Sequence, residues 1–276
     1  MHHAADFAAA RSAASHAGEE ILRLYARFEA IANAPADIST EADRRAQEII
    51  LEYLSQTYPG DAFCAEEATP TLEKVAHAGP RLWIIDPIDG SRGFARKNGE
   101  FSVMIALVEH GHIVLGVVLE PARGRVTYAV RGQGCWREDG KEIPQRCKVS
   151  TIADWTGATL VRSRSEKGQA PPSTLQKQRY TYSAGIKLAM VARGEADVYT
   201  SNYHGFHAWD LCAGHILVEE AGGQVTDARG RAIDYPENGG GAIEGTVASN
   251  GLLHEAAIGY RRSAIGQEEE PPAGSR

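Results

Sequence analysis

Two aspartates stand at the end of an apolar run in the N-terminal half of the chain. Asp86 and Asp89 follow Trp83-Ile84-Ile85 in the segment "WIIDPIDGSRGF". Other carboxylates also adjoin apolar segments, namely Glu66 and Glu67 in "CAEEATP" and Asp210 in "HAWDLCAGH". A buried carboxylate is costly unless it is paired or binds a metal ion, and oxygen ligands without His or Cys suit magnesium. The pattern indicates a magnesium site, which could polarise a phosphate group.

Each acidic position also has an interpretation without chemistry. The first pair of aspartates lies among turn formers, the glutamate pair could belong to a solvated loop, and Asp210 could be the first-turn acid of a helix. Asp43, three residues after Thr40, fits a capping box. Taken singly these interpretations are favoured, but the combination favours a metal site. If a helix starts at Gly90 and Ser91, its backbone N–H groups form an anion site beside that metal site.

The N-terminal half must supply the scaffold for the first aspartates. Helical spacing of apolar residues predicts helices over 4–28 and 40–57, and the run 82–85 predicts a buried strand. The segment 101–136 holds three strand-like runs separated by turn signals, which predicts an antiparallel meander. We expect Pro87 to fix a turn that aims both aspartates at one place.

The pattern changes after about residue 150 to alternating strands and helices, which is typical of an α/β unit. Strands are predicted at 158–161, 196–199, 224–226 and 245–248, and helices at 185–193, 211–221 and 252–260. We therefore predict an N-terminal α+β domain over 1–150 with an antiparallel sheet that carries most metal ligands, and a C-terminal α/β domain over 151–262. The segment 263–276 is charged and proline-rich, so we expect it to be a disordered tail.

The composition argues against several functional classes. The chain has 276 residues, of which 43% are hydrophobic, so it can bury a sizeable core. A net charge of −7 gives no electrostatic footprint for a nucleic-acid polymer. No stretch is long and apolar enough to predict a membrane span. The four cysteines form no CxxC pair, so reduced thiols in a cytoplasmic protein are expected.

The acidic segments resemble those of the inositol monophosphatase superfamily of magnesium-dependent, lithium-sensitive phosphatases. "WIIDPIDGSRGF" is similar to the family's first signature, and "WDLCAGHILVEEAGG" is similar to its second. "AEEA", "DISTEAD" and "VASNGLLHE" resemble the family's acidic loop, its upstream aspartate segment and its closing strand and helix. The resemblance extends over most of the chain, from about residue 13 to 254, and two long signatures in order make it specific.

The resemblance implies a role for each matching residue. Two or three magnesium ions would be held by side chains of four acids and one backbone carbonyl, namely Glu66, Asp86, Asp89, Asp210 and the carbonyl of Ile88. Ser91, where most relatives have Thr, would activate the attacking water together with Asp43. Gly90 and Ser91 would hold the phosphate through their N–H groups, and Glu67 would support the ligands. Water would attack in line, without a covalent enzyme intermediate.

Several segments resemble the bacterial CysQ-type branch, the 3′(2′),5′-bisphosphate nucleotidases. These are "RKNGEFSVMIALVEHG", "SRSEKG" and "SAGIKLAMVARGEADVY". The resemblance implies substrate contacts from Gly185 and from Lys187, whose charge suits a doubly phosphorylated nucleotide, although a solvated helix lysine is an equal alternative. Glu166 replaces the histidine of that branch and Ser201 its arginine. "GFHAWD" is closer to the inositol phosphatase pattern, but it lacks the glutamate that those enzymes often carry at Tyr203.

The family likeness also implies a fold, a substrate class and an assembly. We expect a layered α/β/α/β/α sandwich with the active site between the two halves, and a homodimer is possible. The preferred reaction is hydrolysis of 3′-phosphoadenosine 5′-phosphate to AMP. The alternatives are inositol monophosphate, histidinol phosphate and a sugar phosphate. A non-catalytic protein that binds a phosphorylated ligand is the alternative from another class, but the retained carboxylates argue against it.

Overall fold

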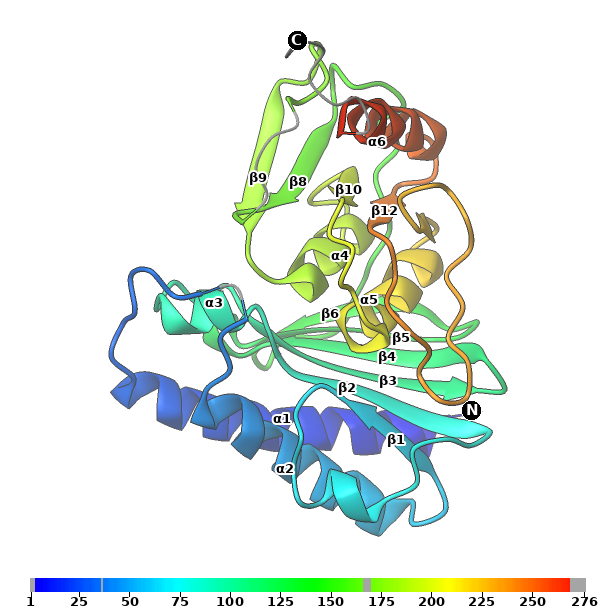
Figure 1. Ribbon diagram of the computed structural model, residues 1–276. Coiled ribbons are helices and arrows are strands. Elements are labelled where there is room, and N and C mark those ends of the chain that lie inside the picture. The colour runs from blue at the N-terminus through cyan, green and yellow to red at the C-terminus, as the bar shows by residue number, and fades with distance from the viewer. Residues whose placement is uncertain (1–2, 36, 166–169, 269–276) are drawn as a thin grey trace, which may run out of the picture.

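The computed structural model describes residues 3–35, 37–165 and 170–268. Two β-sheets alternate with three groups of helices, so the molecule is built as the layered α/β/α/β/α sandwich that the family resemblance implies (Figure 1). Apolar side chains fill each boundary between layers, because a sheet buried on both faces must meet helices on each side. Within the described ranges, no helix is long and apolar enough to cross a membrane.

The outer helical layer consists of α1 (Ala4–Arg27) and α2 (Glu41–Thr57). Both confirm the predicted helices to within a residue or two. The buried face of α1 is made largely of alanine, which lets the helix lie close to its neighbours, whereas α2 contributes larger side chains such as Ile50 and Leu54. Thr40 caps α2, since its hydroxyl oxygen accepts a hydrogen bond from the backbone N–H of Ala42 at 3.1 Å.

The first sheet has seven strands in sequential order. They are β1 (Ala62–Ala65), β2 (Arg81–Asp89), β3 (Ser102–Glu109), β4 (His112–Glu120), β5 (Arg125–Val130), β6 (Gly134–Asp139) and β7 (Gln145–Arg146). The meander predicted from 101 onward is confirmed, and every pair from β2 to β7 is antiparallel. At one edge of the sheet, β1 pairs with β2 in parallel. The segment between them, with the short helix η1 (Leu72–Lys74), returns the chain to the same end of the sheet.

Strand β2 explains why an apolar run can end in acids. Trp83 and Ile85 point to the α1/α2 side, whereas Leu82 and Ile84 point to the opposite side, so both faces of the strand are buried. The predicted strand ends before the two aspartates, whereas the observed strand continues through both of them to Asp89. Pro87 therefore lies at a register shift inside the strand rather than in a turn, because proline has no N–H to donate to the ladder.

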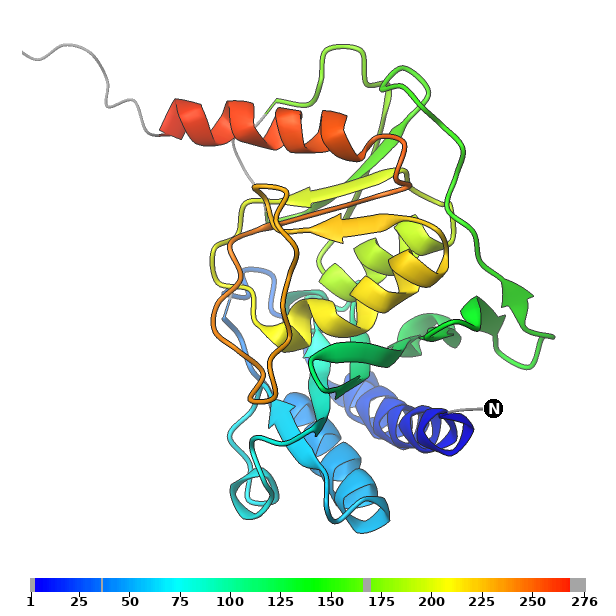
Figure 2. The ribbon, with the colours of Figure 1, turned by 90° about the vertical axis from the view of Figure 1, so that its right-hand side faces the viewer.

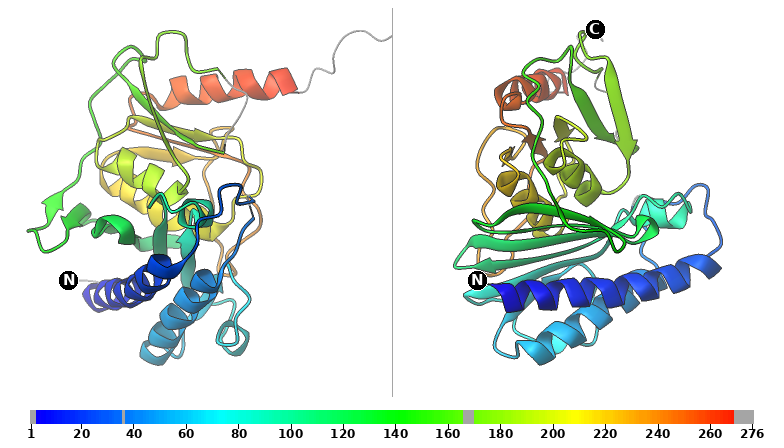
Figure 3. Two further views of the ribbon diagram at one scale, coloured as in Figure 1. Left: turned by 90° about the vertical axis from the view of Figure 1, so that its left-hand side faces the viewer. Right: turned by 180° about the vertical axis from the view of Figure 1, so that it is seen from behind.

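The second sheet follows the order β11-β12-β10-β8-β9. Its strands are β8 (Thr159–Ser163), β9 (Lys177–Thr181), β10 (Val198–Ser201), β11 (Gln224–Thr226) and β12 (Thr246–Ser249). Helices α4 (Ala184–Ala192) and α5 (Ala208–Glu220) lie between the two sheets, and α6 (His254–Glu268) covers the outer face of the second sheet (Figures 2 and 3). The strand β9 carries no apolar pattern, which is why the sequence did not predict it. Helix α6 continues beyond residue 262, into the expected tail, and residues 269–276 lie outside the described part.

Two short helices complete the described elements, α3 (Ser91–Ala95) after β2 and η2 (Pro121–Arg123) after β4. The helix expected to begin at Gly90 and Ser91 is thus present, with Gly90 as its N-cap residue at a φ of 89°. A side chain at Gly90 would be strained at this φ, and a Cβ atom there would lie 2.7 Å from the carbonyl oxygen of Glu100. Glycine at this position therefore allows the segment carrying Glu100 to pack against the start of α3.

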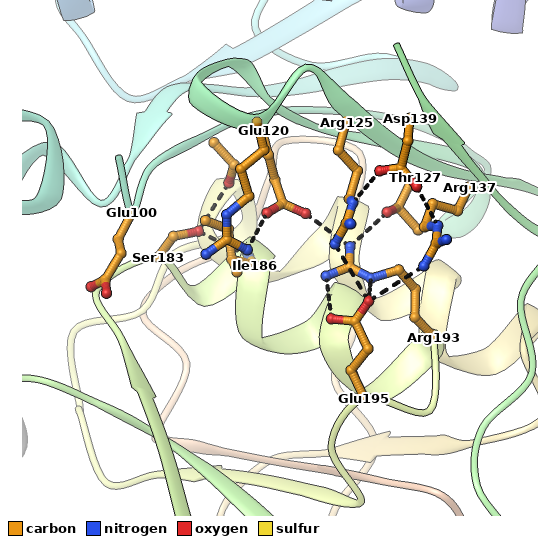
Figure 4. Close-up of polar contacts among 12 residues, drawn as sticks. Glu100, Glu120, Arg125, Thr127, Arg137, Asp139, Ser183, Ile186, Arg193 and Glu195 are labelled. Carbon is orange, nitrogen blue, oxygen red and sulfur yellow. Dashed lines mark hydrogen bonds and ion pairs between the residues drawn. The ribbon is translucent and has the colours of Figure 1, made fainter. Parts of the chain in front are cut away.

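A buried ion network joins α4 to the first sheet (Figure 4). At the C-terminal end of α4, the Arg193 side chain is 1% exposed and donates to Glu120 Oε1 at 2.9 Å and to Thr127 Oγ1 at 2.8 Å. Its other nitrogens bind Glu195 at 2.8 and 3.0 Å. The carboxylate of Glu120 is fully buried, so its charge depends on this arginine and on the more exposed Arg123. The network fixes α4 between the two sheets.

Candidate active site and metal centre

Two parallel strands carry acidic residues to the same edge of the first sheet. In the β1–β2 pair, Ala65 lies opposite Ile85. Glu66 and Asp86 are the next residues along these strands, so their side chains leave the sheet next to each other. The two carboxyl groups are close enough to interact, so that Glu66 raises the pKa of Asp86 while a hydrogen bond with Asp86 lowers the pKa of Glu66. The parallel pairing of β1, which the sequence did not predict, is therefore what brings the acidic loop to the aspartates of β2.

Asp210 reaches the same place from the second half of the chain. Asp86 continues the alternation of Leu82 and Ile84 toward the α4/α5 layer, and Asp210 lies in the first turn of α5. One carboxylate oxygen from each of Asp86, Asp89 and Asp210 lies within 4.8 Å of the other two. Asp86 Oδ1 is buried and accepts no hydrogen bond from the described residues. A buried carboxylate oxygen without a donor, in a cluster made only of oxygens, fits a hard divalent cation.

Burial and neighbouring negative charge raise the pKa values of the carboxyl groups in the cluster. Burial raises the pKa of Glu66 to about 8 and that of Asp210 to about 7, and it raises the pKa of Asp86 well above its usual range. Repulsion between the neighbouring carboxylates adds to the effect of burial in all three cases. A bound cation would offset both effects by favouring the charged forms of the carboxyl groups.

Asp43 has two structural roles at once. Its Oδ2 accepts hydrogen bonds from the backbone N–H of Thr40 at 2.8 Å and from the Thr40 hydroxyl at 2.6 Å, which completes the predicted capping box of α2. Its Oδ1 lies 2.7 Å from Ser91 Oγ, which is also 2.8 Å from the carbonyl oxygen of Ile88. Burial raises the pKa of the Asp43 carboxyl, and the bonds from Thr40 and Ser91 oppose that shift. Capping and hydroxyl binding are therefore compatible functions of one carboxylate.

Asp89 is held by the start of α4. Its carboxylate accepts hydrogen bonds from the backbone N–H of Ala184 at 3.1 Å and of Gly185 at 2.6 Å. The hydroxyls of Ser183 and Ser102 donate to the same group, the latter at 3.3 Å. Gly185 is thus placed against Asp89, and a Cβ atom there would lie 2.7 Å from Met104 Sδ. The start of α4, which belongs to the next layer, therefore fixes the orientation of the Asp89 side chain.

A sequence profile of the inositol monophosphatase family matches residues 4–265. The chain belongs to this family. Its members are metal-dependent phosphatases, and the chain is accordingly a phosphoric monoester hydrolase. The family match agrees with the site, where a cluster of acidic residues that could bind metal lies next to a hydroxyl–carboxylate pair.

Curated relatives with different activities are about equally similar to the chain. A fructose-1,6-bisphosphatase/inositol-1-monophosphatase of Thermotoga maritima is 33% identical over 231 residues, which cover 80% of this chain and 81% of that protein. The 3′(2′),5′-bisphosphate nucleotidase CysQ of Escherichia coli K12 is 31% identical over 80% of this chain and 90% of its own length. A histidinol-phosphatase of Mycobacterium tuberculosis is 33% identical over 79% and 82%, respectively. Identity alone therefore leaves the substrate open.

Solved structures agree with the layered fold. The extragenic suppressor protein suhB of Bartonella henselae superimposes with a TM-score of 0.78 at 26% identity, over 95% of this chain and all of that one. The CysQ protein of Bacteroides thetaiotaomicron, a bacterial member of the family, superimposes with a TM-score of 0.70 at 26% identity, over 90% of this chain and 97% of that one. Structures of more than one branch thus share the same architecture.

Substitution of Ser91 tests whether its hydroxyl takes part in phosphate release. We expect Ser91→Ala to lower magnesium-dependent phosphate release roughly a hundredfold or more, since the proton acceptor next to Asp43 is lost. Ser91→Thr should retain most of the activity, because it keeps the hydroxyl. Initial rates of phosphate release from both variants make the comparison, with melting temperatures as a check of folding. Wild-type turnover by Ser91→Ala would exclude this role.

The raised pKa values predict that magnesium stabilises the protein more at high pH. Without metal, Glu66 and Asp210 stay protonated in the folded state above their ordinary pKa values of 4.5 and 3.8. Their contribution to stability is fully present below those values and is lost as the pH rises through about 7 and 8. Magnesium binds the deprotonated forms and should reverse the loss.

Thermal unfolding at pH 5 and pH 8.5, in chelator and in magnesium, measures this effect. The increase in melting temperature caused by magnesium should be larger at pH 8.5. Glu66→Gln removes one titrating group and should reduce the difference between the two pH values. An equal magnesium effect at both pH values, in the wild-type protein, would contradict the proposed ligand set.

The structure shows the burial of Lys187 and the contacts of Glu67, which the sequence left open. Lys187 is 1% exposed, so the alternative of a solvated helix lysine is wrong. Its ammonium donates to the carbonyl oxygens of Tyr182 at 2.9 Å and Thr181 at 3.3 Å, and it lowers the pKa of Asp210. Glu67 contacts α2 through its backbone, as its N–H donates to Gln47 Oε1 at 2.8 Å.

Gln47 is a buried residue of the site that the sequence analysis missed. Its amide nitrogen donates to the carbonyl oxygen of Glu67 at 2.5 Å and to Thr69 Oγ1 at 3.1 Å. Gln47 follows Asp43 by four residues, and therefore lies on the same face of α2. That spacing is the signal that could have revealed it. Through Gln47 and Asp43, α2 positions both the acidic loop and Ser91.

The aromatic residues before Asp210 form a partly exposed cluster. Tyr203 is 60% exposed and contacts the ring of Phe206 edge-on, at 5.2 Å between centroids. His207 stacks on Trp209, with 4.4 Å between the ring centroids. Glu166, at the position of the nucleotidase histidine, lies outside the described residues.

Proposed function

We propose that the protein is a magnesium-dependent phosphomonoesterase that acts on a 3′(2′),5′-bisphosphate nucleotide and converts 3′-phosphoadenosine 5′-phosphate to AMP. The observation that supports phosphate ester hydrolysis is the convergence of the carboxylate cluster with the Ser91–Asp43 pair. The nucleotide preference is supported by the CysQ-like segments, one of which places the positive charge of Lys187 near Asp210. Inositol monophosphate, histidinol phosphate and a sugar phosphate are the alternative substrates.

Two or three magnesium ions would be held by the side chains of Glu66, Asp86, Asp89 and Asp210 and by the backbone carbonyl of Ile88, and the mutual proximity of Asp86, Asp89 and Asp210 supports this ligand set. When bound, magnesium polarises phosphate oxygens and lowers the pKa of a coordinated water. The fit rests on the acceptor without a donor at Asp86 Oδ1 and on the absence of nitrogen and sulfur from the three-carboxylate cluster. We expect lithium to inhibit, by competition for this site.

The protein's own groups would orient the substrate and move one proton. Ser91 Oγ can accept a proton from the attacking water while it passes its own proton to Asp43 Oδ1, 2.7 Å away. The carbonyl oxygen of Ile88 restricts the hydroxyl to this position. The N–H groups of Gly90 and Ser91 would hold the phosphate, and Glu67 would keep the acidic loop negative next to the ligands.

Phosphate release from a substrate panel, with and without magnesium, tests the proposal. The panel contains 3′-phosphoadenosine 5′-phosphate, inositol 1-phosphate, histidinol phosphate and fructose 1,6-bisphosphate. We expect magnesium-dependent release with the highest kcat/KM for the nucleotide. A higher value for inositol 1-phosphate or histidinol phosphate would reassign the substrate and keep the metal site. Release without magnesium, at the same rate, would overturn the metal assignment.

A further inference from the structure

A pocket of about 510 Å³ opens beside the end of α3. Five side chains line it, those of Arg96, Asn98, Arg164, Tyr180 and Tyr182. The first two follow α3, Arg164 follows β8, and the tyrosines belong to β9 and the residues after it. The volume lies within the range of pockets that bind small molecules. None of the residues assigned above to metal or phosphate binding is among those that line the pocket.

The pocket is built on the segments that hold the metal-binding aspartate. Tyr182 precedes Ser183, whose hydroxyl donates to Asp89, and the carbonyl of Tyr182 accepts from Lys187 Nζ at 2.9 Å. Asn98, another lining residue, accepts a hydrogen bond from the N–H of Glu100, whose carbonyl oxygen lies close to Gly90 at the start of α3. A substrate with its reacting phosphate at Asp89 and Ser91 could therefore extend into this pocket.

The two arginines of the pocket differ in whether a carboxylate neutralises their charge. Arg164 binds the buried carboxylate of Glu100 through two nitrogens at 2.6 to 2.9 Å, so its charge is neutralised and its plane is fixed. Arg96 lies over the ring of Tyr182, with 5.9 Å between the guanidinium carbon and the ring centroid. Within the described ranges, no carboxylate pairs with Arg96. The pocket thus presents an uncompensated cation in a chain whose net charge is −7.

The remaining groups of the pocket are mainly donors and flat rings. The side-chain oxygen of Asn98 accepts from the Glu100 N–H at 3.0 Å, and its amide nitrogen makes no hydrogen bond to the described residues. Arg164 keeps nitrogens that Glu100 does not use. Guanidinium groups bind phosphate well, and tyrosine rings offer an apolar surface to a planar base.

We propose that this pocket binds the second phosphate of a nucleoside bisphosphate, the one that is not hydrolysed, with Arg96 as the residue that determines specificity. The inference rests on the proposed nucleotidase function, and it adds the residues that would select for a second phosphate. Arg96 binds the remote phosphate, Arg164 donates to it from a fixed position, and the tyrosines face the base.

The test compares two substrates that differ only in the second phosphate, adenosine 3′,5′-bisphosphate and adenosine 3′-phosphate. In Arg96→Gln, we expect the ratio of their kcat/KM values to fall roughly tenfold or more, through KM for the bisphosphate. Arg179→Gln is the matched control, because Arg179 is an exposed cation of β9 that does not line the pocket. This control should keep the wild-type ratio.

Inhibition by AMP isolates the pocket from the chemistry, since AMP carries only the remote phosphate. Its inhibition constant should rise about tenfold in Arg96→Gln, while that of inorganic phosphate stays the same. An unchanged ratio and an unchanged AMP constant would overturn the subsite, even in an active enzyme. If the wild-type protein hydrolyses neither nucleotide, the nucleotidase function fails. Calorimetry with AMP then still tests the pocket, and equal binding by wild type and Arg96→Gln would reject it.

Discussion

Asp86→Asn is expected to lower magnesium-dependent phosphate release roughly a thousandfold or more while the fold stays intact. Asp86 is buried, its Oδ1 accepts no hydrogen bond from the described residues, and it lies within 4.8 Å of oxygens from Asp89 and Asp210. Asparagine keeps the shape of the side chain but removes the charge that attracts a cation. Because the same charge is repelled by neighbouring carboxylates, the metal-free variant should melt at the wild-type temperature or above it.

One further measurement and one control variant separate this effect from misfolding. The melting temperature of Asp86→Asn should no longer rise when magnesium is added, whereas that of the wild-type protein should. Asp234→Asn is a suitable control, because Asp234 is an exposed acid with no hydrogen bond to the described residues. It should match the wild type in both rate and magnesium response. Full activity in Asp86→Asn would disprove the assignment of the metal centre.

Arg193→Met is expected to lower the free energy of unfolding by about 3–5 kcal/mol. The Arg193 side chain is 1% exposed and binds the fully buried Glu120 at 2.9 Å. Methionine fills much of the same space, so the loss comes mainly from a carboxylate that remains buried without its strongest partner. The network also links α4 to the first sheet (Figure 4). The start of α4 in turn holds Asp89 through backbone N–H groups. The variant should therefore also lose activity at temperatures below its melting point.

The same carboxylate offers a matched control. Arg123 binds Glu120 at 2.9 Å as well, but its side chain is 45% exposed. Arg123→Met should cost no more than about 1 kcal/mol, since a solvent-exposed ion pair contributes little. Glu120→Gln combined with Arg193→Met should recover part of the stability that Arg193→Met loses. Denaturant unfolding of the four proteins gives the comparison, and equal losses from both arginine variants would contradict the buried-charge argument.

Local patterns were enough to predict most of the elements. The helices α1 and α2 and the meander from β3 to β6 follow from apolar periodicity and turn residues, which depend only on neighbours in the chain. The strand β9 was missed because its residues are mostly exposed and polar, and β1 because its four residues carry no alternation. Periodicity does not detect an edge strand that is defined by its pairing rather than by its burial.

The sequence by itself determined the chemistry, because carboxylates next to apolar runs and two signature segments identify the kind of site. The tertiary structure decided the connections. Parallel pairing of β1 places Glu66 next to Asp86, and the start of α4 binds Asp89 from the other half of the chain. Burial of Lys187, and the contacts of Gln47 with the acidic loop, also depend on how layers pack. Residue types are readable along the chain, whereas hydrogen bonds and burial between distant segments exist only once the layers have come together.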